Sequence, residues 1–223
     1  MIQSLIKEVV QIEISGKKLT NGTLIDVGSD MIVLFNGVDF VYIPTIHIQK
    51  YKVDRNNEYN IKAPSAPPSI IIEEKNEELS FRRILTQAKG SFVEVYATGN
   101  QSLHGSIVDI MDDYFIFQSP IYKTVYIPLH HLQWLIPYTQ NERPYGLDVD
   151  DDFSSKPNHE SFAKIFEVQV EKFKNKVVIF NIAGNKNHIG KINQVKEQVV
   201  EIQTARMQPV YLNLHHIKTL HLM

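Results

Sequence analysis

Short runs of alternating apolar and polar residues recur along this chain of 223 residues. The run Val10-Gln11-Ile12-Glu13-Ile14 is typical, and such alternation indicates a strand with one buried face. The runs that follow are separated by glycine, asparagine and proline, which favour turns. The pattern therefore predicts strands at residues 10–14, 19–27, 31–35, 40–43 and 49–53.

Individual residues refine this first group of strands. Gly22 lies inside the second strand, where a glycine indicates a bulge, a bend or the close approach of another backbone. Asn36-Gly37 favours a two-residue hairpin turn. Pro44 cannot donate to a sheet ladder, so we expect it to end the fourth strand before a tight turn at residues 45–48.

The same pattern occurs three times in the chain. Its tyrosines, Tyr42, Tyr126 and Tyr211, are 84 and 85 residues apart. A glycine precedes each tyrosine by 20 or 21 residues, and a histidine follows it by five. A long period of this kind indicates a tandem array of one supersecondary unit. These repeated glycines and histidines are Gly22, Gly105, Gly190, His47, His131 and His216.

The second and third copies each begin with a predicted helix. Apolar residues at 81, 84, 85 and 88 have the spacing of an amphipathic helix, with Ser80 as its expected N-cap. A similar helix is expected from Phe162 to Phe173. The strands then repeat at 92–96, 103–110, 114–118, 125–127 and 132–137, and at 177–182, 188–195, 199–204, 209–212 and 217–222.

We therefore predict an all-β protein of three tandem, five-stranded barrels of the small Sm or SH3-like type. Units of this size bury only about 60% of their unfolded surface, so we expect them to pack on each other or on partner chains. The predicted domains are barrels at 1–53, 79–138 and 161–223, joined by an acidic, proline-containing linker at 54–78 and an acidic linker at 139–160.

Composition and charge limit the classes of function that the chain can have. The chain has no cysteine, which excludes disulfides, thiolate metal sites and cysteine nucleophiles. No apolar run approaches the roughly 20 residues that span a membrane, and the N-terminus lacks a signal-peptide pattern, so we expect synthesis and retention inside the producing cell. The net charge is −2, but residues 161–223 carry nine basic and four acidic groups. A candidate basic interaction surface there comprises Lys172, Lys174, Lys176, Lys186, Lys191 and Lys196.

Candidate catalytic and metal-binding residues are few. His47, His131 and His216 could bind a metal or titrate, but no carboxylate or cysteine accompanies them at a regular spacing. We interpret them as structural residues that brace the tight turn. Asp26 and Asp109 match between copies, whereas the third copy has Gln194. Since no known catalytic motif is present either, we expect no enzyme activity, no metal and no cofactor.

Binding of RNA is the main alternative. Sm-type barrels often bind RNA, and the three repeated tyrosines could stack on bases. Against this, the first two copies are electrically neutral and the linkers are acidic. The lysines of the third copy offer the single basic surface, so nucleic acid is the less favoured partner.

The repeat resembles the repeated N-terminal region of endospore coat protein B of spore-forming bacilli. The resemblance rests on three Gly-x-Leu/Ile segments that begin at Gly22, Gly105 and Gly190, and on Leu214-His215-His216-Ile217-Lys218. It implies a non-enzymatic component of the spore coat or exosporium, made in the mother-cell cytoplasm and deposited on the spore surface. Its partners would be other spore coat proteins, with no membrane. Self-association is also expected, because Sm-like barrels commonly pair strands edge to edge into rings. The family's Ser/Lys/Arg-rich tail is not in this sequence, so the role of that tail is not carried over.

Overall fold

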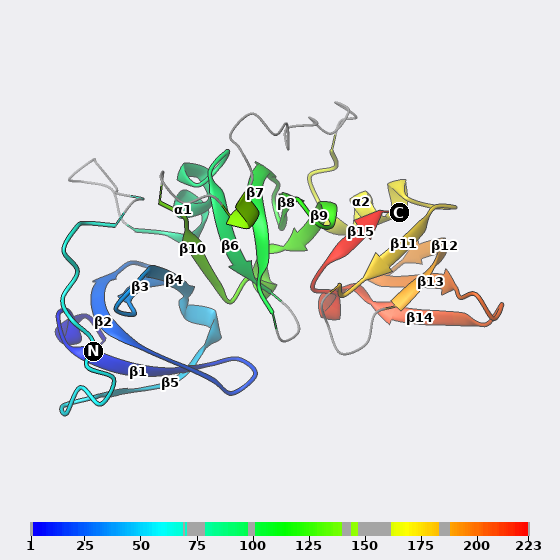
Figure 1. The fold of residues 1–223 in the computed structure, drawn as a ribbon. Helices are drawn as coiled ribbons and strands as arrows, with labels where there is room; N and C mark the ends of the chain where they lie inside the picture. The colour runs from blue at the N-terminus through cyan, green and yellow to red at the C-terminus, as the bar shows by residue number, and fades with distance from the viewer. Residues whose placement is uncertain are drawn as a thin grey trace. The chain divides into compact units, whose positions relative to one another are not determined.

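The structure is a computed structural model in which strands predominate, so the all-β prediction is confirmed (Figure 1). The first repeat contains η1 (Ile2–Leu5), β1 (Val9–Ile14), β2 (Lys18–Val27), β3 (Met31–Phe35), β4 (Phe40–Pro44), η2 (Thr45–His47) and β5 (Ile48–Val53). The residues that the structure describes are 2–68, 70, 79–97, 101–139, 144–146, 162–182 and 188–222.

The second and third repeats follow the same order of elements, each after a helix. The second contains α1 (Phe81–Gln87), β6 (Phe92–Tyr96), β7 (Leu103–Ile110), β8 (Tyr114–Ser119), β9 (Lys123–Pro128), η3 (Leu129–His131) and β10 (Trp134–Pro137), followed by η4 (Pro144–Gly146). The third contains α2 (Phe166–Lys172), β11 (Val177–Phe180), β12 (His188–Lys196), β13 (Val199–Gln203), β14 (Pro209–Asn213), η5 (Leu214–His216) and β15 (Leu220–Leu222).

The chain forms two compact units, Met1–Val95 with Gln133–Glu142, and Tyr96–Leu132 with Arg143–Met223. In the first unit the strand order is β6-β10-β4-β3-β2-β1-β5, and in the second it is β14-β13-β12-β11-β15-β9-β8-β7. The units do not follow the repeats, because β10 of the second repeat pairs with β4 of the first. The division into three domains stays a prediction.

Closed Sm or SH3-like barrels are not confirmed, because the sheet is open. The fourth strand of a repeat would have to pair with the fifth strand of the same repeat to close a barrel. Instead, β4 pairs with β10 and β9 pairs with β15, so each of these fourth strands is covered by the fifth strand of the following repeat. That fifth strand also lies beside the first strand of its own repeat, β10 beside β6 and β15 beside β11. Strand β5 pairs with β1.

The repeated glycines lie where another backbone approaches. A Cβ atom at Gly22 or Gly190 would lie 2.8 Å from a carbonyl oxygen of the third strand, and at Gly105 this distance would be 2.0 Å. The register of the second strand shifts shortly after each glycine, as in a β-bulge, at Leu24/Asp26, Ile107/Asp109 and Ile192/Gln194. A bulge and the close approach of another backbone therefore occur together in the second strand of all three repeats.

Local predictions are confirmed with changes at the edges of elements. Pro44 is the last residue of β4 and directly precedes η2. The turn at Asn36-Gly37 is longer than two residues, because the Asn36 side chain accepts hydrogen bonds from the backbone of Val38 and Asp39. The third repeat's helix begins at Phe166, four residues later than expected.

Candidate functional site

The junctions between fourth and fifth strands are the features that the repeats share and that hold successive copies together. In the first unit, Tyr42 of β4 lies opposite Leu135 of β10. In the second unit, Tyr126 of β9 lies opposite Leu220 of β15. Each fifth-strand residue follows the repeated histidine by four positions, so both junctions have the same register.

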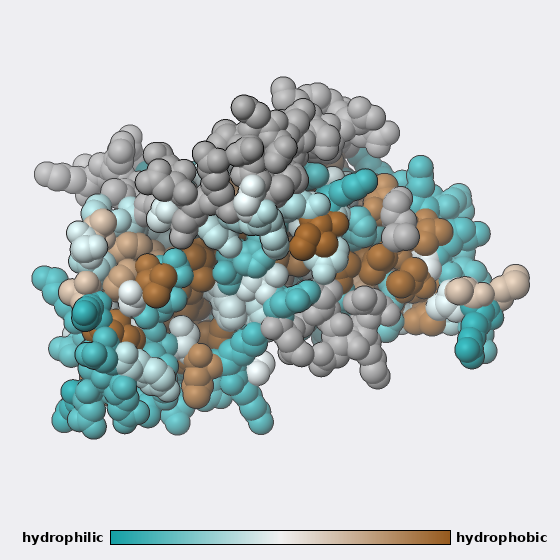
Figure 2. Space-filling view, in the orientation of Figure 1, coloured by the Kyte–Doolittle hydropathy of each residue, from teal (hydrophilic) through white to brown (hydrophobic). Residues whose placement is uncertain are grey.

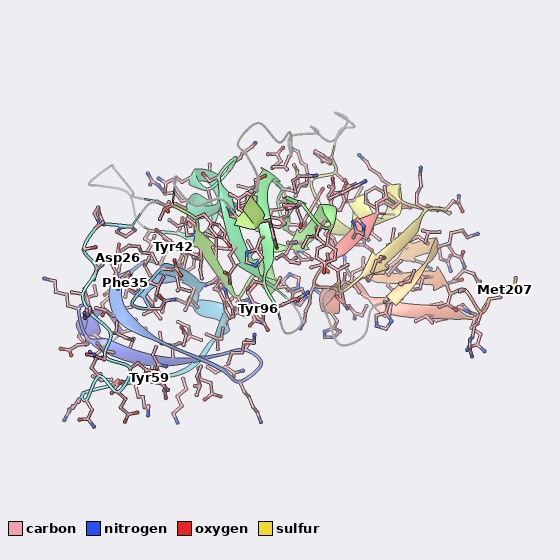
Figure 3. All side chains as sticks on the ribbon, in the orientation of Figure 1. Asp26, Phe35, Tyr42, Tyr59, Tyr96 and Met207 are labelled. Atoms are coloured by element: carbon pink, nitrogen blue, oxygen red, sulfur yellow. The ribbon has the colours of Figure 1, made fainter. Side chains whose placement is uncertain are left out.

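The fourth-strand tyrosines are buried at these junctions. Tyr42 is 1% exposed, lies on β4 in the first unit (Figure 3), and its hydroxyl donates a hydrogen bond of 2.9 Å to the carbonyl oxygen of Ile70. Burial raises the pKa of the Tyr42 phenol well above its ordinary value. Tyr126 is 6% exposed and its ring packs edge to face against Phe173, with 5.2 Å between the ring centroids. Two of the three tyrosines are therefore packed and cannot act as stacking platforms for bases.

A buried polar network supports the junction in the second unit. The Tyr114 hydroxyl donates to the carbonyl oxygen of Ala163 at 2.6 Å and lies 3.2 Å from the Gln169 side-chain oxygen. That oxygen also accepts a hydrogen bond from the backbone N–H of Ala163. Burial raises the pKa of Tyr114, so the phenol remains protonated there. The network fixes the segment that leads into α2.

Two carboxylates that were not predicted as site residues accept hydrogen bonds from the first residues of the two α-helices. Asp30 accepts a hydrogen bond of 2.7 Å from the backbone N–H of Phe81, the first residue of α1. Asp113 makes the same bond to Phe166, the first residue of α2. The expected N-cap, Ser80, makes no side-chain cap hydrogen bond. The signal was available in the sequence, since both aspartates directly precede the third strand of their repeat.

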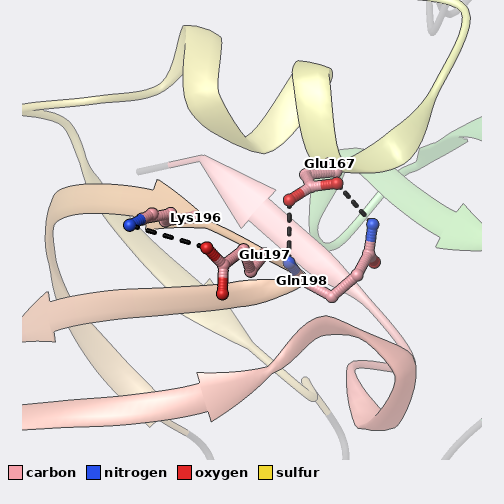
Figure 4. Close-up of polar contacts among 4 residues, drawn as sticks. All are labelled: Glu167, Lys196, Glu197 and Gln198. Carbon is pink, nitrogen blue, oxygen red and sulfur yellow. Dashed lines mark hydrogen bonds and ion pairs between the residues drawn. The ribbon is translucent and has the colours of Figure 1, made fainter.

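The third repeat has Gln198 at the position of these aspartates. Its backbone N–H and its side-chain amide donate hydrogen bonds to the carboxylate of Glu167 in α2, and Lys196 and Glu197 form an exposed ion pair beside it (Figure 4). Gln198 therefore holds the helix of its own repeat, whereas Asp30 and Asp113 each hold the helix that leads into the next one.

The repeated histidines lie in the three short turns before the fifth strands. His47 is buried, with its Nδ1 atom 3.2 Å from the Ser15 hydroxyl. His131 has its Nε2 atom 2.8 Å from the carbonyl oxygen of His215, and His216 is exposed. Their role as braces of the turn stays a prediction, because they do not share one set of partners. Among the described residues no group of three metal-ligating side chains lies together.

The predicted basic surface is only partly assembled. Val177 lies opposite Lys191 in the sheet, which brings Lys191 close to Lys176 and the turn after α2. Lys196 lies at the far end of β12, and Lys186 lies outside the described residues. Lys172, Lys174, Lys176, Lys191 and Lys196 are all exposed.

Tyr211 differs from its two counterparts. It lies on β14, at the end of the sheet order, and is 63% exposed. Its neighbours Val210 and Leu212 are half-buried, whereas their counterparts Val41, Ile43, Val125 and Ile127 are buried. Polar residues cover much of the described surface in Figure 2, with separate apolar patches between them. Among the described strands, β14 pairs with β13 alone and leaves the aromatic side chain of Tyr211 exposed at the edge of the sheet.

These features define a tandem-repeat β protein in which a fourth strand pairs, edge to edge, with the fifth strand of the following repeat. The third-domain model of the YwrJ family matches residues 165–220. Protein YwrJ of Bacillus subtilis (strain 168) is 35% identical over 216 residues, covering 96% of this chain and 95% of the relative. The chain belongs to the YwrJ family.

A second relative is more distant. Spore coat protein B of Bacillus subtilis (strain 168) is 27% identical over 150 residues, covering 65% of this chain and 36% of the relative. The resemblance to coat protein B is therefore confirmed in part, as a partial and more distant similarity. No helix in the described part of the chain is long and apolar enough to cross a membrane.

Proposed function

We propose that this protein is a non-enzymatic structural component of the bacterial spore coat or exosporium that acts through protein–protein assembly. The observation that carries the proposal is the similarity to spore coat protein B across 65% of the chain. The similarity covers just over a third of that relative, so the proposal concerns the repeats alone.

The arrangement of the strands supports an assembly role. The internal junctions bury a tyrosine, a backbone ladder and a polar network without forming a catalytic constellation among the described residues. The same kind of ladder is available at the uncovered edge of β14, and exposed sheet edges with apolar residues favour pairing with another chain. The partners we propose are other spore coat proteins and further copies of this chain.

The test is the location of the protein in a sporulating Bacillus. A tagged copy would be expressed from a sporulation promoter, and purified spores would be extracted with detergent and alkali before immunoblotting. We expect the protein in the coat extract and on the spore surface by immunogold labelling. A control fusion of the tag to an unrelated cytoplasmic protein should be lost on washing. Recovery of the repeat protein in the mother-cell lysate alone would contradict the proposal.

A further inference from the structure

Two strand edges of this chain lack a neighbour that the corresponding strands have. Among the described strands, β4 lies between β3 and β10, and β9 lies between β8 and β15. Strand β14, the fourth strand of the last repeat, pairs with β13 alone. Strand β5, the fifth strand of the first repeat, pairs with β1 alone. The described strands therefore leave one fourth-strand edge and one fifth-strand edge without a neighbouring strand.

The free edge of β14 keeps the residues of a buried junction. Its sequence Val210-Tyr211-Leu212 matches Val125-Tyr126-Ile127, yet Tyr211 is 63% exposed and Tyr126 is 6% exposed. An exposed strand edge with apolar side chains is a template for pairing with another strand. What covers this edge should resemble the strands that cover β4 and β9.

We propose that β14 of one chain pairs with β5 of a second copy, antiparallel and in the register of the two internal junctions. In those junctions the fourth-strand tyrosine lies opposite the residue four positions after the repeated histidine. For β5 that residue is Tyr51, four positions after His47. The intermolecular junction therefore places Tyr211 opposite Tyr51. This inference rests on the proposed assembly function and names its partner.

Charge makes the intermolecular junction weaker than the internal ones. In the proposed register Lys50 and Lys52 of β5 lie opposite Leu212 and Val210, where β10 supplies Trp134 and Ile136. Lysines on an edge strand oppose pairing, and the last repeat has nine basic against four acidic residues. Salt screens this repulsion, so we expect association to increase with ionic strength.

The two edges belong to different surfaces, so the contact is heterologous. Such a contact does not close into a two-fold dimer. It continues from copy to copy and gives a ring where the rotation closes or a filament where it does not.

The absence of cysteine allows a direct test by disulfide capture. One copy would carry Tyr211→Cys and the other Tyr51→Cys, since directly opposed residues in an antiparallel pair have a Cα separation that a disulfide can bridge. Oxidised glutathione would be added to the mixture at several protein and salt concentrations. The matched control replaces Tyr51→Cys by Lys52→Cys, one residue out of register and on the other face of the strand.

We expect the 211–51 heterodimer to form at least about tenfold faster than the 211–52 control, a discrimination of about 1.4 kcal/mol. Light scattering of the unmodified protein should show a mass that grows above 25.7 kDa with concentration and with salt. The variant Tyr211→Lys, on an exposed side chain, should remain at the monomer mass with an unchanged circular dichroism spectrum.

Three results would overturn the inference. They are an unmodified protein that stays at 25.7 kDa under all conditions, equal capture at positions 51 and 52, and homodimers of Tyr211→Cys in preference to the heterodimer. A strictly monomeric protein that nevertheless localises to the spore surface would refute the edge pairing and leave the proposed function intact. A protein that pairs with itself but is absent from spores would support the edge pairing and refute the proposed function.

Discussion

Replacing Tyr42 by alanine tests whether the fourth-strand tyrosine holds the junction. The side chain is 1% exposed, so almost its whole surface is withdrawn from water, and truncating a buried aromatic residue costs about 3–5 kcal/mol. Loss of the hydroxyl bond to Ile70 accounts for about 1 kcal/mol of this, which Tyr42→Phe measures separately. The counterpart Tyr211→Ala is the matched control, since its exposed side chain predicts a change within about 0.5 kcal/mol at low protein concentration.

The assay is urea unfolding followed by the fluorescence of Trp134, the single tryptophan. This residue begins β10 and directly precedes Leu135, the partner of Tyr42, so its signal reports on the junction itself. We expect a clearly lower midpoint for Tyr42→Ala, an intermediate one for Tyr42→Phe and an unchanged one for Tyr211→Ala. Equal effects of Tyr42→Ala and Tyr211→Ala would refute the reasoning that pairing between repeats buries one tyrosine and leaves the other exposed.

Three further predictions concern stability. Gly105→Ala should lower the free energy of unfolding by about 3 kcal/mol or more in chemical denaturation, because its Cβ would lie 2.0 Å from the Gln118 carbonyl oxygen. Gly90→Ala, with open space but a φ of 80°, should lower it by only about 1–2 kcal/mol. Equal losses in the two variants would contradict the close approach at Gly105. Asp113→Ala should lower stability by about 1 kcal/mol and Asp113→Asn by less, measured by thermal unfolding, because the Asp113 side chain accepts a hydrogen bond from the backbone N–H of Phe166. Unchanged stability in both variants would contradict a capping role for Asp113. Burial raises the pKa of Tyr114, so the unfolded chain loses this proton first, and stability is unaffected below pH 10 and falls above it by up to about 1.4 kcal/mol per pH unit. A Tyr114→Phe variant should show a shallower alkaline loss, and an unchanged slope would argue against a buried neutral phenol.

The sequence predicted the elements well because each repeat repeats the same physical constraints. Alternation places β1, and the in-strand glycines mark both a bulge and a close approach of the third strand. These signals are local, and three copies reinforce one another. The strands therefore appear within one or two residues of the expected bounds in most cases.

Strand partners could not be predicted in the same way. Every repeat supplies an equivalent fifth strand, so the pattern around Tyr42 fits Tyr51 of its own repeat and Leu135 of the next one equally well. Which of them pairs depends on the path of the connecting segment and on packing between repeats. Neither the path of the connecting segment nor the packing between repeats leaves a periodic signal in the sequence. For this reason the pattern could not distinguish closed barrels from the open sheet.

The capping residues show a second limit of local reasoning. Ser80 stands where an N-cap is expected from the nearby sequence, but the acceptor for the Phe81 N–H is Asp30, which lies 51 residues away in sequence. A carboxylate is a stronger acceptor than a hydroxyl and complements the positive end of the helix. The alignment of Asp30 with Asp113 was the available clue, and Gln198 in the third repeat obscured it.

Disulfide capture within one chain tests the central claim, that a fourth strand pairs with the fifth strand of the following repeat. The variant Tyr42→Cys/Leu135→Cys joins residues that lie directly opposite each other, while Tyr42→Cys/Tyr51→Cys joins the residues that a barrel closed on its own repeat would bring together. Both variants carry the same change at Tyr42, so any loss of stability there is matched. We predict rapid intramolecular disulfide formation in the first variant and little in the second. The opposite result would show closed repeats and would contradict the pairing between successive repeats on which this account depends.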